Sequence, residues 1–197
     1  EGVVTVDSTG WVAPLSDGEA VIHIHAADGV DATMKVQVSH LATDVPINFP
    51  NEVVPVFTKY GCNSGGCHGK SGGQNGFRLS LLGFEPTEDF EFLVKEGRGR
   101  RVFPAAPEQS LLLTKATGVL PHGGGQRFDL DTPAYRNILR WIDQGLPYGN
   151  ADDPTIVRIE VTPGEQLMKP SARQQLTVAA FYTDGSTKDV TRTTQFE

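Results

Sequence analysis

The pattern of hydrophobic and polar residues changes twice along the chain. In residues 3–38 and again in residues 155–197, apolar and polar positions alternate in short runs, such as residues 20–25, and glycines separate the runs. Alternation of this kind predicts short antiparallel strands. The pair Asp184-Gly185 lies between two such runs and is a strong signal for a hairpin turn. Both ends of the chain are therefore predicted to be β structure.

The middle of the chain has the period of amphipathic helices instead. Apolar residues recur at helical spacing in residues 51–61 and again in residues 132–145. In the second segment Thr132 is a good N-cap, Pro133 suits the first helical position and Gly145 can end the helix. The apolar face predicted for this helix consists of Tyr135, Ile138, Leu139 and Ile142, with Trp141 beside it.

The only two cysteines lie between these predicted helices, in the segment Cys62-Asn-Ser-Gly-Gly-Cys67-His68. Two thiols followed directly by a histidine are what covalent haem attachment requires, because the sulfurs add to the two vinyl groups and the histidine binds the iron. The usual motif has two residues between the cysteines and this one has four, but Gly65 and Gly66 permit a tight loop. A disulfide loop and half of a zinc site, completed by a second histidine, are the alternative interpretations.

The order of these features resembles a class I cytochrome c domain, and in detail the planctomycete cytochrome c domain family. The resemblance covers residues 49–149, about half the chain, and implies one covalently bound haem c per chain. It also implies single-electron transfer to a redox partner protein, not enzymatic catalysis. The matching segments are Tyr60-Gly-Cys-Asn-Ser-Gly-Gly-Cys-His-Gly69, Asn75-Gly-Phe-Arg-Leu-Ser80, Ala106-Pro-Glu-Gln-Ser-Leu-Leu-Leu113 and Leu120-Pro-His-Gly-Gly-Gly125.

The sixth iron ligand is predicted to be His122. In class I cytochromes this ligand comes from a loop before the last helix, often as Met-Pro, but Met34 and Met168 both lie outside the matching region. The corresponding loop contains His122 within a glycine run. A surface histidine, an open sixth position, or a ligand from elsewhere such as Met168 or His40 are the alternatives. Two imidazoles would give a lower reduction potential than a methionine–histidine pair.

The propionates of a haem require cationic neighbours, and three arginines of the middle region are candidates. Arg78, Arg100 and Arg101 are suited to this role because a planar guanidinium binds both oxygens of a carboxylate. A solvated surface charge is the alternative for each of them. Phe57 and Phe77 are predicted to form part of the pocket wall. The predicted cofactor site consists of Cys62, Cys67, His68, His122, Arg78, Arg100, Arg101, Phe57 and Phe77, with His68 and His122 as metal ligands.

The two ends of the chain resemble different halves of a bacterial Ig-like domain of group 2. Residues 1–40 resemble the second half, and residues 155–197 resemble the first. Each half alone would leave apolar strand faces and unpaired edges exposed. We therefore expect the halves to pair within one chain or to exchange between two chains; two truncated β modules are the alternative. The predicted fold class is multidomain α + β, with an all-α cytochrome c domain (residues 49–149) flanked by antiparallel β-sandwich segments.

Composition and charge exclude some function classes. The formal net charge is −7 and no basic run suggests nucleic-acid binding. No apolar run is long enough to cross a membrane. Bacterial haem c is attached outside the cytoplasm, so the resemblance implies a periplasmic or cell-surface location. A haem enzyme or gas sensor with an open sixth position, and a non-haem Ig-like adhesion or scaffold module, are the alternative functions.

Overall fold

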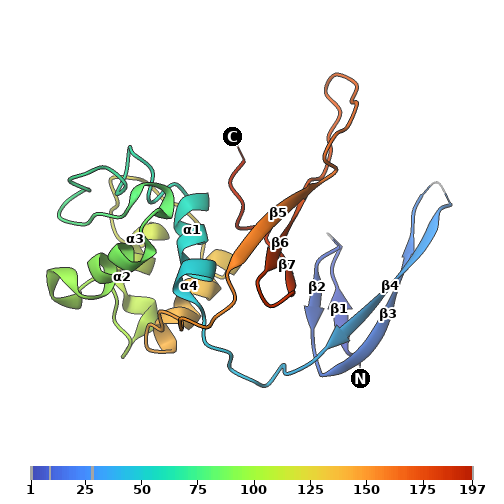
Figure 1. Ribbon diagram of the computed structural model, residues 1–197, viewed down its shortest axis with the longest axis horizontal. Helices are drawn as coiled ribbons and strands as arrows, with labels where there is room; N and C mark the ends of the chain where they lie inside the picture. Colours follow the sequence, from blue (N-terminus) through green and yellow to red (C-terminus); the bar gives the residue numbers. More distant parts are fainter. Residues whose placement is uncertain (1, 9, 28, 197) are drawn as a thin grey trace. The chain divides into compact units, whose positions relative to one another are not determined.

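The computed structural model describes residues 2–8, 10–27 and 29–196, and its ribbon is shown in Figure 1. The chain divides into two compact units, residues 1–45 and residues 46–197. Residues 1 and 197, at the outer ends of the two segments predicted to be Ig-like halves, lie outside the described residues.

The first unit consists of two β-hairpins. Strand β1 (Val4–Val6) pairs antiparallel with β2 (Val12–Pro14), and β3 (Gly18–His25) pairs antiparallel with β4 (Asp31–Val38). In the second hairpin Ile22 lies opposite Met34, so these apolar side chains share a face. None of the described residues of this unit is buried. The unit therefore has no hydrophobic core of its own.

The second unit begins with helical segments and ends with a small sheet. Its α-helices are α1 (Val54–Lys59), α2 (Pro86–Val94), α3 (Leu111–Ala116) and α4 (Pro133–Asp143), and the π-helical turn η1 (Phe49–Val53) leads into α1. Short 3-10 turns lie at Leu81–Gly83, Glu96–Gly99 and Pro107–Gln109. The strands β5 (Ile156–Thr162), β6 (Thr177–Tyr182) and β7 (Thr187–Asp189) form an antiparallel sheet in the order β5-β6-β7.

The core of the second unit is built around one aromatic cluster. Phe49 and Trp141 are fully buried, with ring centres 5.2 Å apart, and Phe90 packs edge-on against Phe49 at 5.3 Å. The Trp141 indole nitrogen donates a hydrogen bond to the Pro147 carbonyl (2.8 Å), so its polar atom is satisfied inside the core. This cluster fixes α4 against η1 and α2.

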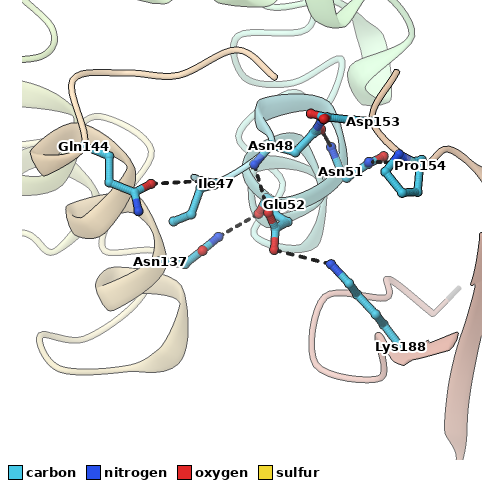
Figure 2. Close-up of polar contacts among 9 residues, drawn as sticks. All are labelled: Ile47, Asn48, Asn51, Glu52, Asn137, Gln144, Asp153, Pro154 and Lys188. Carbon is cyan, nitrogen blue, oxygen red and sulfur yellow. Dashed lines mark hydrogen bonds and ion pairs between the residues drawn. The ribbon is translucent and has the colours of Figure 1, made fainter. Parts of the chain in front are cut away.

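Polar contacts join the start of the helical region to the segment that precedes β5 (Figure 2). Asn48 Nδ2 donates to Asp153 Oδ2 (2.8 Å), and Asn51 Nδ2 donates to the Pro154 carbonyl (2.8 Å). These side chains anchor the chain where it passes from helix to sheet. The remaining contacts in the figure join Ile47 to Gln144, Asn48 to Asn51 and to Glu52, and Glu52 to Asn137 and to Lys188.

The predicted fold class is wrong. The described residues contain seven strands in three small antiparallel sheets and only four α-helices of six to eleven residues, so the chain does not contain an all-α cytochrome domain flanked by sandwiches. The physical reason is the glycine content of the middle region. Gly61, Gly118 and Gly145 all have positive φ and lie two residues after the ends of α1, α3 and α4, where a longer helix would have to continue.

Several local predictions are confirmed. Helix α4 starts after Thr132, whose Oγ1 accepts a hydrogen bond from the Tyr135 N–H (3.3 Å), and Gly145 follows it with φ +80°. Gly185, with φ +81°, lies in the turn between β6 and β7. Each of the three sheets lies wholly within one unit. The pairing of Ig-like halves, within a chain or between two, remains a prediction.

Candidate cofactor site

The loop that carries both cysteines leaves α1 through a sharp turn. Gly61 has φ +68°, and the Cys62 N–H donates to the Phe57 carbonyl (2.8 Å), which ties the loop to the helix end. The loop closes on itself, because the His68 N–H donates to the Cys62 carbonyl (3.0 Å). Both cysteines are free thiols and line the same cavity. The four-residue spacing is therefore compatible with both sulfurs facing one bound group.

Gly69 is required at the end of this loop for steric reasons. A β-carbon at position 69 would lie 1.9 Å from the Asn63 carbonyl oxygen and 2.9 Å from that of Ser64. Both neighbours are backbone atoms inside the folded loop, so they cannot move aside cheaply. Close backbone packing therefore permits only glycine at the position after His68.

His68 is held from the core side of the cavity. Its Nδ1 donates to the Phe77 carbonyl (2.9 Å), and its ring centre lies 4.5 Å from that of Phe77. The Leu79 N–H donates to the His68 carbonyl (2.8 Å). Burial lowers the pKa of His68, and the nearby His122 and Arg101 lower it further. The imidazole is thus neutral at pH 7, with its proton on Nδ1 and a free lone pair on Nε2.

His122 is held in a different way, by its own loop. Its Nδ1 donates to the Gly125 carbonyl (2.8 Å), and Lys115 Nζ donates to the Pro121 carbonyl (2.8 Å), which fastens the loop to α3. Because a carbonyl can only accept, Nδ1 carries the proton and Nε2 again has the free lone pair. Both histidines therefore present the nitrogen that a metal binds, with the other nitrogen fixed by a backbone carbonyl.

The two imidazoles lie close together with nearly parallel planes. Their ring centres are 6.4 Å apart, and the angle between the planes is 6°. This distance is too long for direct stacking but suits a single metal atom between them. A metal–imidazole bond is about 2.0 Å long and a ring nitrogen lies about 1.2 Å from the ring centre, so two imidazoles on opposite sides of one metal have centres about 6.4 Å apart.

The cavity between the histidines has a volume of about 530 Å³, within the range of small-molecule and cofactor sites. Eight of the nine predicted site residues line it, and Arg78 does not. No Asp or Glu is among the residues that line the cavity, although the chain as a whole is acidic. Its cationic lining suits a ligand with acidic groups. The residues that give it its chemistry are Cys62, Cys67, His68 and His122, the cations Arg100, Arg101, Lys115 and Arg127, and the apolar Phe57, Phe77, Leu79, Leu111 and Leu112.

Two of the three predicted propionate partners have other contacts. The Arg101 guanidinium donates to the carbonyls of Phe92 and Glu96 (2.7 Å each) and also to that of Gly76, so most of its donors bind the backbone. Arg78 lies outside the cavity lining, 3.8 Å from the centre of the Phe92 ring. Arg100 lines the cavity. The role of all three toward propionates remains a prediction.

Arg127 is a cavity residue that the sequence did not single out. Its Nη2 donates to Cys67 Sγ (3.3 Å) and its Nη1 donates to the Tyr60 carbonyl (3.3 Å). Burial raises the pKa of Cys62 to about 11, and Arg127 is the main opposing influence. The only sequence feature that could have indicated this role is that Arg127 comes two residues after the glycine run 123–125. Its contacts lie some sixty residues earlier in the chain, which no local pattern reveals.

The donors present fit a covalently attached haem. A haem c with two histidine ligands takes two thiols and two imidazoles from the protein, and all four line this cavity. In the part of the chain that the structure describes, no group of three or more His, Cys, Asp or Glu side chains is arranged to hold a metal ion. A haem iron needs only two protein ligands, since the porphyrin supplies the other four.

No family model matches the chain, and it matches no curated protein and no solved structure. The resemblance to the planctomycete cytochrome c domain family therefore remains a prediction. No described helix is long and apolar enough to cross a membrane.

Proposed function

We propose that this chain binds one haem c through Cys62 and Cys67, with His68 and His122 as axial ligands, and acts in single-electron transfer. One observation carries the proposal. Two parallel imidazoles, with ring centres 6.4 Å apart, line the same cavity as both free thiols. In each imidazole the Nδ1–H donates a hydrogen bond to a backbone carbonyl, which leaves Nε2 available to bind a metal.

The residues of the site orient the two histidine rings and shield the cavity from water. The Phe77 and Gly125 carbonyls fix the ring orientation of the two histidines and make each Nε2 a better donor. Apolar side chains such as Phe57 and Leu79, both buried, limit the access of water. The cationic lining offsets carboxylate charge on a ligand. When bound, haem supplies an iron that gains or loses one electron without a bond being made or broken in a substrate.

Occupation of both axial positions favours electron transfer over catalysis. A haem enzyme or gas sensor needs an open or displaceable sixth position, whereas the nearness and parallel planes of the His68 and His122 rings support a filled one. Bis-histidine ligation favours low-spin iron and a low reduction potential. The proposal includes a redox partner protein and a periplasmic or cell-surface location, where haem c is attached in bacteria.

The first test is covalent retention. The protein is produced in a bacterium with a haem c maturation system, then denatured, and its mass and pyridine haemochrome spectrum are measured. We expect the mass of the polypeptide plus one haem. The haemochrome spectrum should be that of a haem attached through two thioether bonds. The double variant Cys62→Ala/Cys67→Ala is the control and should retain none. A wild-type protein with the mass of the bare polypeptide would contradict the proposal.

The second test asks whether His122 binds the iron at the sixth position. Reduced wild-type protein should bind carbon monoxide slowly or not at all, because His122 occupies the site, whereas His122→Ala should bind it rapidly. Both proteins should retain covalent haem. Equal, rapid binding by the two would favour the alternative, a haem enzyme or sensor with an open position.

A further inference from the structure

Arg127 lies where the cysteine loop meets the His122 loop. Its guanidinium reaches the Tyr60 carbonyl and Cys67 Sγ on one side, both at 3.3 Å. On the other side, its Nη2 would be 2.7 Å from a β-carbon placed at Gly124. The Arg127 N–H donates to the Ala116 carbonyl (2.7 Å), which anchors the backbone to the end of α3. One side chain thus contacts the parts of the site that carry a thiol and an axial imidazole.

The charge of Arg127 is not neutralised by an ion pair. No carboxylate of the described residues pairs with it, and its Nε is buried without a hydrogen-bond partner there. Arg127 is half-buried, and burying its Nε without a hydrogen-bond partner costs free energy. Its remaining contacts are a sulfur and a carbonyl, neither of which carries a full charge. The guanidinium thus lies beside the two loops without a compensating anion among the described residues.

Gly124 completes this contact from the other loop. Besides Arg127, a β-carbon at position 124 would lie 3.1 Å from His122 Cε1 and 3.4 Å from His122 Nε2. The imidazole and the guanidinium therefore both pack directly against the bare backbone of Gly124. A methyl group at position 124 would push both the Arg127 guanidinium and the His122 imidazole away from this backbone.

We propose that Arg127 is a positioning residue which, packed against Gly124, holds the His122 imidazole parallel to that of His68. The inference rests on the proposed function and adds a determinant of axial-ligand geometry to it. The angle between two axial imidazole planes sets the splitting of the iron d orbitals. Parallel planes give a rhombic low-spin ferric signal in electron paramagnetic resonance, and perpendicular planes give a strongly anisotropic one. The 6° angle predicts the rhombic signal for the wild type.

The test compares Arg127→Gln and Gly124→Ala with two matched controls. Arg136→Gln removes the same charge from an exposed position on α4, and Gly72→Ala adds a methyl group where nothing lies within 4 Å. We expect both site variants to retain covalent haem, to lose the rhombic signal, and to bind carbon monoxide at least tenfold faster when reduced. Arg127→Lys keeps the charge but lacks the planar fork, so it should not restore the rhombic signal.

A second readout does not depend on haem. In haem-free protein, nitrogen-15 NMR of the His122 ring reports whether the proton stays on Nδ1. Arg127→Gln should weaken that preference and Arg136→Gln should keep it. A lowered melting temperature with an unchanged resonance signal and unchanged tautomer would reduce Arg127 to a structural role and overturn the inference. Absence of covalent haem from the wild type would instead overturn the proposed function, and the NMR comparison would then decide the inference.

Discussion

The two histidines of the site are held by structures of different kinds. His68 follows a loop closed by backbone hydrogen bonds, and its ring lies against Phe77 beside the core. His122 lies in a glycine loop, where its ring bonds the Gly125 carbonyl of the same loop. The first is fixed by the fold of the domain, whereas the second depends on a few side-chain contacts. We expect perturbations on the His68 side to cost stability and those on the His122 side to change ligation.

The largest effect should come from Gly69→Ala. The added methyl group would meet the backbone of Asn63 and Ser64, so the cysteine loop must open to accept it. We expect a loss of about 4 kcal/mol in the free energy of unfolding, the upper range for single substitutions. Thermal and urea unfolding measure it, with Gly72→Ala as the control because its methyl group would enter open space. Equal stability of the two variants would show that the loop is not packed as described.

A second effect on the His68 side concerns Asp89. This fully buried carboxylate accepts hydrogen bonds from the Ser80 N–H and from Ser80 Oγ (2.8 Å), and so holds the strand-like segment that supports His68. Asp89→Ala would leave the Ser80 N–H without its partner. We expect a loss of about 1–3 kcal/mol, the cost of an unsatisfied buried donor. Asp89→Asn, which keeps one acceptor oxygen, should lose less, and an order reversed between the two would contradict this role.

The same carboxyl gives a pH dependence with a defined sign. Burial raises the pKa of Asp89 above its usual value of 3.8. The folded protein therefore holds this proton more tightly than the unfolded chain does, so its contribution to stability is greatest below pH 3.8 and is lost as the pH rises through the folded-state pKa. Asp89→Asn cannot titrate. Urea unfolding from pH 3 to 7 should show the variant gaining stability relative to the wild type, and a constant difference would contradict the shift.

The smallest effect should come from Lys115→Ala on the His122 side. Its ammonium donates to the Pro121 carbonyl from an exposed position, so its loss should cost about 0.5 kcal/mol or less. The same change frees one end of the His122 loop. We expect faster amide exchange at Gly123 and Gly125 with an almost unchanged melting temperature. Unchanged exchange would mean that the loop is held by Arg127 and Gly124 alone.

The sequence predicted which side chains line one cavity better than it predicted the fold around them. The spacing of Cys62, Cys67 and His68, and the position of His122, are local facts, and the structure brings all four to one cavity. The thiol contact of Arg127 was missed because it joins residues sixty positions apart. The roles of Arg100 and Arg101 could not be separated by sequence, since only the fold shows that Arg101 donates to three carbonyls.

The error in fold class has a physical explanation. Helical spacing predicts that a helix forms but not where it stops, and glycines with positive φ stop these helices after six to eleven residues. Alternation in the flanking regions predicted strands and one hairpin turn. It could not predict a sandwich, because alternation specifies which face of a strand is apolar and not which other sheet covers that face.

None of the described residues of the first unit is buried, whereas the second unit has a core around Trp141, and the chain's two tryptophans are divided between the units. Trp11 is 45% exposed and Trp141 is fully enclosed. The protein thus carries two intrinsic fluorophores, with Trp11 emitting near the wavelength of tryptophan in water and Trp141 further to the blue. Replacing Trp11 by phenylalanine would leave an emission that follows the melting of the second unit alone, without any added label.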